Sequence, residues 1–121
     1  MQGILIVEDD AELREMIKVA LVRRKFMVIE AANGLEAIAY FKPLVIDLVI
    51  TAIIMPEEDG LAVIRKLKEI KPALKVIAMS VGGKASPRHY LDLAKLFGAD
   101  ATLTKPFMIN DLISIVDNLL R

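Results

Sequence analysis

Five short runs of apolar residues, separated by longer amphipathic stretches, are the feature of this chain that most restricts its fold. The runs are almost continuously apolar rather than alternating, which predicts strands that are buried on both faces. Such strands occur in parallel sheets that lie between two layers of helices. The predicted fold is therefore α/β, a doubly wound, five-stranded parallel sheet. The runs are Ile4–Val7, Phe26–Ile29, Leu48–Ile50, Val76–Met79 and Ala101–Leu103.

The stretches between the runs carry apolar residues at helical spacing. Asp9 or Asp10 is expected to cap the first helix, and Asn33 has Glu36 three residues later, which is the spacing of a capping box at the second. The predicted helices cover about 11–24, a short segment from Asn33, 61–70, Ser86–Pro87 to Gly98, and 109–120.

Composition excludes several classes of protein. The length of 121 residues fits a single domain, predicted to span 1–121. Sixteen basic residues balance sixteen acidic ones, so no nucleic-acid partner is expected. The chain has no cysteine and no basic, apolar leader, and no apolar run long enough to span a membrane. We therefore expect a cytoplasmic protein without a membrane partner.

Residues that would line one site follow four of the five predicted strands; three of these sets are polar or charged, and the set after the third strand is an alanine. In a parallel α/β sheet the carboxyl ends of the strands line one crevice, so these residues are expected to lie close together. Two carboxylates in such a crevice are suited to Mg²⁺, and an ammonium and a hydroxyl to phosphoryl oxygens. The residues are Glu8 and Asp9, Ala52, Ser80, and Thr104 with Lys105.

These residues belong to a set of motifs that resembles the receiver domain of two-component response regulators over nearly the whole chain. The resemblance implies a flavodoxin-like (βα)5 fold with strand order 2-1-3-4-5. It also implies a signalling module rather than an enzyme, although a receiver with an intact acceptor would catalyse its own phosphotransfer and dephosphorylation. The motifs are Ile4–Asp10, Met55–Pro56 with Asp59–Gly60, Ser80, Gly98–Asp100 and Leu103–Phe107.

In that family an aspartate after the third strand accepts a phosphoryl group from a phosphohistidine. The resemblance assigns this phosphoacceptor position to Ala52, which has no carboxylate. It also implies that Glu8, Asp9 and the backbone carbonyl of Ile54 bind Mg²⁺. Because one of three expected carboxylates is missing, we expect weaker Mg²⁺ binding here.

The resemblance assigns three further roles. Lys105 would pair with the acceptor carboxylate and then with the phosphoryl group, and Ser80 would donate a hydrogen bond to a phosphoryl oxygen. Thr102 stands at the switch position, which is usually aromatic. The Lys105–Pro106 peptide is expected to be cis. Without an acceptor carboxylate, Lys105 is expected to turn to Asp9 or to solvent.

Ala52 is open to three interpretations. It could be a core alanine in an unrelated domain, including a small flavodoxin-like binding domain, but the chain has no phosphate-binding loop motif. It could belong to a natural receiver without an acceptor, which acts as a phosphorylation-independent interaction module. Alternatively, it could be an engineered replacement of aspartate, a phospho-dead variant. The retained pocket residues favour the engineered variant.

The resemblance also implies protein partners: a sensor histidine kinase or phosphotransfer protein, and a downstream target. The target is expected to bind the face formed by the fourth helix, fifth strand and fifth helix, where a homodimer could also form. Surplus apolar residues favour this face, and the alternative is a helix that turns a wide surface to the core. The residues concerned are Tyr90, Leu91, Leu93, Leu96, Phe97 and Ile115.

Overall fold

A computed structural model describes residues 1–56, 59–81 and 89–121, with the side chains of residues 89–91 left out. Five parallel strands form one sheet in the order β2-β1-β3-β4-β5, which confirms the predicted doubly wound fold. The strands are β1 (Gly3–Val7), β2 (Met27–Ala31), β3 (Ile46–Ala52), β4 (Lys75–Val81) and β5 (Ala101–Lys105).

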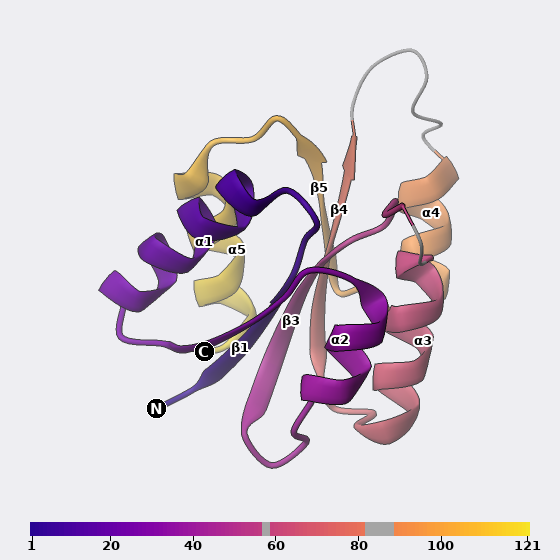
Figure 1. The fold of residues 1–121 in the computed structure, drawn as a ribbon, viewed down its shortest axis with the longest axis horizontal. Coiled ribbons are helices and arrows are strands. Elements are labelled where there is room, and N and C mark those ends of the chain that lie inside the picture. Colours follow the sequence, from indigo (N-terminus) through magenta and orange to yellow (C-terminus); the bar gives the residue numbers. More distant parts are fainter. Residues whose placement is uncertain (57–58, 82–88) are drawn as a thin grey trace.

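A helix follows each strand, and the helices cover both faces of the sheet. Figure 1 shows α1 and α5 together on one face and α2, α3 and α4 on the other. None of the described helices combines the length and apolar character needed to cross a membrane. The helices are α1 (Ala11–Arg23), α2 (Gly34–Tyr40), α3 (Gly60–Ile70), α4 (His89–Leu96) and α5 (Ile109–Leu119). The predicted helix start at Ser86–Pro87 lies outside the described residues.

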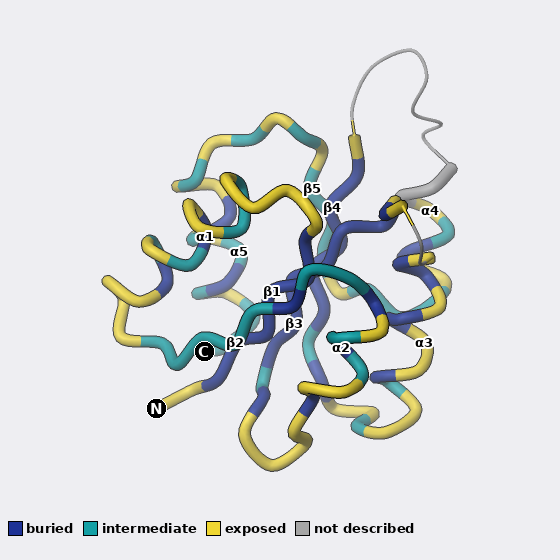
Figure 2. The backbone as a smooth tube through the Cα atoms, in the orientation of Figure 1, coloured by how far each residue is buried: buried dark blue, intermediate teal, exposed yellow. Residues whose placement is uncertain are grey.

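The core lies where the sequence places its apolar runs. All of β1 is buried, and β3 and β4 are buried along most of their length, as the dark segments in the centre of Figure 2 show. Both faces of these strands meet helices, which explains why their sequences do not alternate between apolar and polar residues. The sheet therefore forms a rigid support for the residues at its carboxyl edge.

The second strand is longer than its apolar run predicts. The prediction ends it at Ile29, whereas β2 continues through Glu30, whose backbone pairs with Ile6 of β1. The Glu30 carboxylate is neutralised by α1, with Arg14 Nε at 3.3 Å and Lys18 Nζ at 3.2 Å. A charged side chain can therefore extend a strand when a neighbouring helix supplies its counter-ions.

Side chains cap the first two helices and fix how the chain leaves the sheet. Of the two candidates for the first cap, it is Asp10 whose Oδ1 accepts hydrogen bonds from Glu12 N at 3.0 Å and Leu13 N at 3.3 Å. At α2, Asn33 Oδ1 accepts from Glu36 N while Glu36 Oε1 accepts from Ala32 N, which confirms the predicted capping box. The cap at Asp10 matters most for function because it sets the path of Glu8 and Asp9.

Candidate functional site

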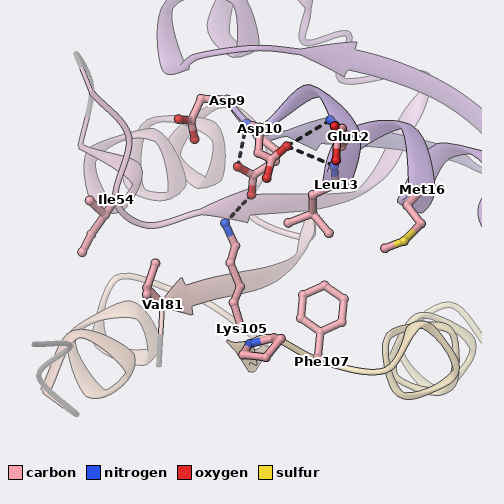
Figure 3. Close-up of a pocket in the computed structure, with 11 residues that line it drawn as sticks. Asp9, Asp10, Glu12, Leu13, Met16, Ile54, Val81, Lys105 and Phe107 are labelled. Carbon is pink, nitrogen blue, oxygen red and sulfur yellow. Dashed lines mark hydrogen bonds and ion pairs between the residues drawn. The ribbon is translucent and has the colours of Figure 1, made fainter. Parts of the chain in front are cut away.

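A pocket of about 690 Å³ opens at the carboxyl edge of the sheet, between the start of α1 and the end of β5. Figure 3 shows charged and apolar side chains around it, with Lys105 rising from β5 toward the acidic turn before α1. The carboxyl ends of the strands form this edge, as the predicted topology requires. Its charged walls are Glu8, Asp9, Asp10, Glu12 and Lys105, and its apolar walls include Leu13, Met16 and Phe107.

Glu8 is the most constrained residue of the pocket. It follows β1 directly and is only 1% exposed. Its Oε2 accepts a hydrogen bond from Asp10 N at 3.0 Å, and its backbone carbonyl accepts one from Arg14 Nη1 at 2.7 Å. Lys105 Nζ lies 2.5 Å from Glu8 Oε1. Both carboxylate oxygens therefore have a donor, and a full positive charge neutralises the buried group.

The prediction that Lys105 turns to Asp9 or to solvent is wrong. Asp9 is exposed, and Figure 3 shows its carboxylate apart from the Lys105 ammonium. Glu8 is buried, so its attraction for an ammonium is screened less by water than that of Asp9. The lysine side chain is itself only 19% exposed, because it crosses the pocket to reach Glu8.

Ala52 is the last residue of β3 and is 1% exposed. It pairs with Met79 of β4, which pairs with Leu103 of β5. Side chains in register on parallel neighbours lie on the same face of a sheet, and every second residue returns to that face. Ala52 and Lys105 therefore belong to the same face, and a carboxylate at position 52 would lie on the side of the sheet from which Lys105 extends.

The backbone after Ala52 is held by the start of α3. Gly60 N donates a hydrogen bond to Ile53 O at 2.7 Å, and Ile54 and Asp59 form an isolated antiparallel bridge. Asp59 Oδ1 accepts from Leu61 N at 2.9 Å and so caps α3. Ile54 lines the pocket with a half-exposed side chain, while the predicted role of its carbonyl stays a prediction.

Ser80 and Thr102 do not form part of the pocket wall. Ser80 is buried at the end of β4 and pairs with the exposed Thr104, and Thr102 is partly buried opposite Ala78. The strand alternation puts Ser80 and Thr104 on the sheet face opposite to Lys105. Of the described residues, Ala52, Ser80 and Thr102 are absent from the pocket lining, so the structure groups Glu8, Asp9, Ile54 and Lys105 more closely than the rest.

The residues present do not make a complete cation site. Oxygen donors at Glu8 and Asp9 have the chemistry that Mg²⁺ prefers. However, Lys105 engages Glu8, and position 52 carries only a methyl group. Across the part of the chain that the structure describes, no three acidic or histidine side chains gather closely enough to hold a metal ion.

Sequence reasoning missed part of this arrangement. The apolar wall of Leu13, Met16 and Phe107 gave no signal, because such residues at helical spacing or next to proline usually belong to the core. The contact of Arg14 with the Glu8 carbonyl also gave none, since it depends on the angle at which α1 leaves β1. The Lys105–Pro106 peptide is cis, as predicted.

Comparisons with known proteins agree on one family. The family model described as "Response regulator receiver domain" matches residues 4–117. The chain is 36% identical to the chemotaxis protein CheY of Bacillus subtilis over 98% of this chain and 97% of that protein. It is 34% identical to the transcriptional regulatory protein ResD of the same organism, over 98% of this chain and 48% of that protein, so it spans about half of ResD.

Solved structures give the same result. A response regulator receiver domain protein from Clostridium thermocellum superposes with a TM-score of 0.89 at 29% identity, covering 99% of this chain and 94% of that one. The response regulator TrrA of Thermotoga maritima, solved in complex with Mg(2+)-BeF, gives a TM-score of 0.83 at 33% identity. That comparison covers 98% of this chain and 99% of TrrA.

Proposed function

Because this chain belongs to the family of response regulator receiver domains, we propose that it is a phosphorelay receiver silenced at its phosphoacceptor position. Members of the family are signalling modules rather than conventional enzymes. The observation that carries the proposal is Ala52, a buried methyl group at the end of β3, on the same sheet face as Lys105. An alanine has no oxygen that can attack phosphorus, so no acyl phosphate forms there.

The form of the domain that is competent for phosphotransfer would carry aspartate at position 52. It would take a phosphoryl group from a sensor histidine kinase or phosphotransfer protein in the cytoplasm. Lys105 would bind phosphoryl oxygens from the sheet face that it shares with position 52. Ser80 would donate a hydrogen bond to a phosphoryl oxygen from the other face, around the end of β4, and Thr102 would be the switch residue. We interpret Ala52 as an engineered Asp-to-Ala replacement, because the charged residues around it remain in place.

The downstream protein target is proposed to bind the face of α4, β5 and α5. Leu96 of α4 supports this choice because its side chain is 80% exposed. A homodimer through the same face is a second use of that surface. Of the other residues predicted there, Leu93, Phe97 and Ile115 pack partly against the core, and the side chains of Tyr90 and Leu91 lie outside the described residues.

Ala52→Asp should restore phosphorylation. After incubation with acetyl phosphate and Mg²⁺, we expect intact-mass spectrometry to find one phosphoryl group on Ala52→Asp and none on the chain with Ala52, here called the parent. The reason is that aspartate supplies both the nucleophilic oxygen and a carboxylate beside Glu8 and Asp9.

Ala52→Asn is the matched control, since asparagine has nearly the same volume as aspartate but no nucleophilic carboxylate. It should stay unlabelled. If neither acetyl phosphate nor a phosphohistidine donor labels a folded Ala52→Asp protein, the proposal fails. That result would favour the phosphorylation-independent interaction module of the same fold.

Ala52→Asp should also change how Mg²⁺ affects stability. Without metal, a third carboxylate near Glu8 and Asp9 adds like-charge repulsion in a buried position, at about 2 kcal/mol. This corresponds to a melting temperature lower by roughly 8 °C. Mg²⁺ should recover that loss, because it binds the folded three-carboxylate site more tightly than the parent's weakened site. Thermal melts of both proteins with Mg²⁺ and with chelator test this, and a higher metal-free melting temperature for Ala52→Asp would contradict it.

A further inference from the structure

The contact between Glu8 and Lys105 crosses the carboxyl edge of the sheet from β1 to β5. Glu8 follows β1 and Lys105 ends β5, and the sheet order places β3 and β4 between these two strands. Three strand spacings amount to roughly 14 Å, so both side chains must extend toward each other to meet. The ion pair therefore lies across the end of β3, where Ala52 is located.

Glu8 is fully satisfied in this arrangement. Lys105 Nζ occupies one carboxylate oxygen at 2.5 Å, and the Asp10 amide occupies the other at 3.0 Å. The carboxylate is 1% exposed, so little water competes with these donors. A divalent cation that approached Glu8 would have to displace the ammonium, or bind beside it and meet its charge at short range.

The other described residues of the site give a cation little compensation. Asp9 is exposed and can bind a cation only as a weak surface ligand. Position 52 offers a methyl group instead of the third carboxylate. The alanine also explains the direction that Lys105 takes, because without a carboxylate at position 52 Glu8 is the one buried acidic side chain among the described residues.

We propose that the Lys105 ammonium is the built-in cation of this site and takes the place of a divalent metal ion. The pocket keeps one arrangement whether or not Mg²⁺ is present, so the signalling state of the chain does not depend on metal. The inference goes beyond the proposed function, since it concerns the chain with Ala52 as it stands and involves no phosphoryl transfer.

Removing the ammonium tests the proposal directly. Mg²⁺ and Mn²⁺ binding to the parent and to Lys105→Met is measured by isothermal titration calorimetry at fixed ionic strength, with thermal melts of the same samples. We expect the parent's melting temperature to change little with Mg²⁺. Lys105→Met should bind either ion at least roughly tenfold more tightly, because Glu8 is freed and the like charge is gone. Its melting temperature should rise with metal.

Three further variants separate this mechanism from a general change of charge. Lys66→Met removes an exposed lysine of α3 and should leave the metal affinity at the parent value. Lys105→Arg keeps the positive charge and should bind metal as weakly as the parent. The double variant Lys105→Met/Glu8→Gln should lose the gain, since the carboxylate that binds the metal is gone.

Two outcomes would overturn the proposal. One is a folded Lys105→Met whose metal affinity equals that of the parent. The other is a parent whose melting temperature rises with Mg²⁺ as much as that of Ala52→Asp, a measurement that holds even if Lys105→Met does not fold. Failure of Ala52→Asp to accept a phosphoryl group would refute the proposed function and leave this metal result unaffected.

Discussion

Gly60→Ala should destabilise the domain by about 4 kcal/mol, which lowers its melting temperature by roughly 15 °C. A Cβ atom at position 60 would lie 2.1 Å from the Ala52 carbonyl oxygen and 2.6 Å from Ile53 Cα. Both are backbone atoms of the segment that leaves β3, so no side-chain rotation relieves the clash. The helix cannot withdraw either, since Gly60 N donates to Ile53 O at 2.7 Å. Chemical denaturation and thermal melts measure the loss.

Gly98→Ala is the control for this prediction. A Cβ atom there would meet only the flexible Lys68 side chain, at 3.3 Å, although the φ of +116° strains any residue with a side chain. We expect this variant to lose about 1–2 kcal/mol. If Gly60→Ala loses no more than Gly98→Ala, the close approach of α3 to the end of β3 does not fix the backbone around Ala52.

The effect at Gly60 has a functional consequence. The contact holds the main chain of Ala52 and Ile53, and so sets where any side chain at position 52 enters the site. In an Ala52→Asp background, a Gly60→Ala protein that still folds would hold the acceptor carboxylate in a displaced position. The glycine after Asp59 is therefore part of the site, although its own atoms do no chemistry.

The fold could be predicted from the sequence because burial of a parallel strand leaves a direct mark. Ile4–Val7 has no polar position, and among strands that pattern is typical of one covered on both faces. The edge strand was harder to delimit, because β2 continues through the charged residue Glu30 to Ala31. The Glu30 charge is neutralised by residues of α1 that are more than ten positions away in the sequence. Apolar runs therefore locate strands better than they locate strand ends.

The site could be predicted only in part. Strand ends converge at one edge in this topology, so the grouping of Glu8, Asp9 and Lys105 followed from the order of elements. The partner of Lys105 did not follow, since it depends on how deeply Glu8 is buried and on how far the lysine reaches across two strands. A sequence records which charges are present, but the choice between two neighbouring carboxylates depends on the solvent exposure of each.

Lys105→Met should lower the metal-free stability of the domain by about 3 kcal/mol, because it leaves the Glu8 charge buried and without its counter-ion. Glu8→Gln should lose less, about 1 kcal/mol, since the Lys105 ammonium is 19% exposed and can turn to water. The double variant should lose less than Lys105→Met alone. Urea denaturation of the four proteins in chelator gives a coupling free energy, expected to be about 2 kcal/mol.

The exposed pair of Arg65 and Glu69 on α3 is the matched control for this cycle. Its side chains are 70% and 66% exposed, so its coupling should be only about 0.3–0.5 kcal/mol. Equal coupling in the two cycles would mean that burial adds nothing to the contact between Glu8 and Lys105.

The double-mutant cycle of Glu8 and Lys105, repeated in an Ala52→Asp background, tests the cause of that contact. An aspartate at position 52 offers Lys105 a second carboxylate on its own sheet face, so the coupling to Glu8 should fall. If it does not fall, the lysine binds Glu8 for reasons unrelated to Ala52.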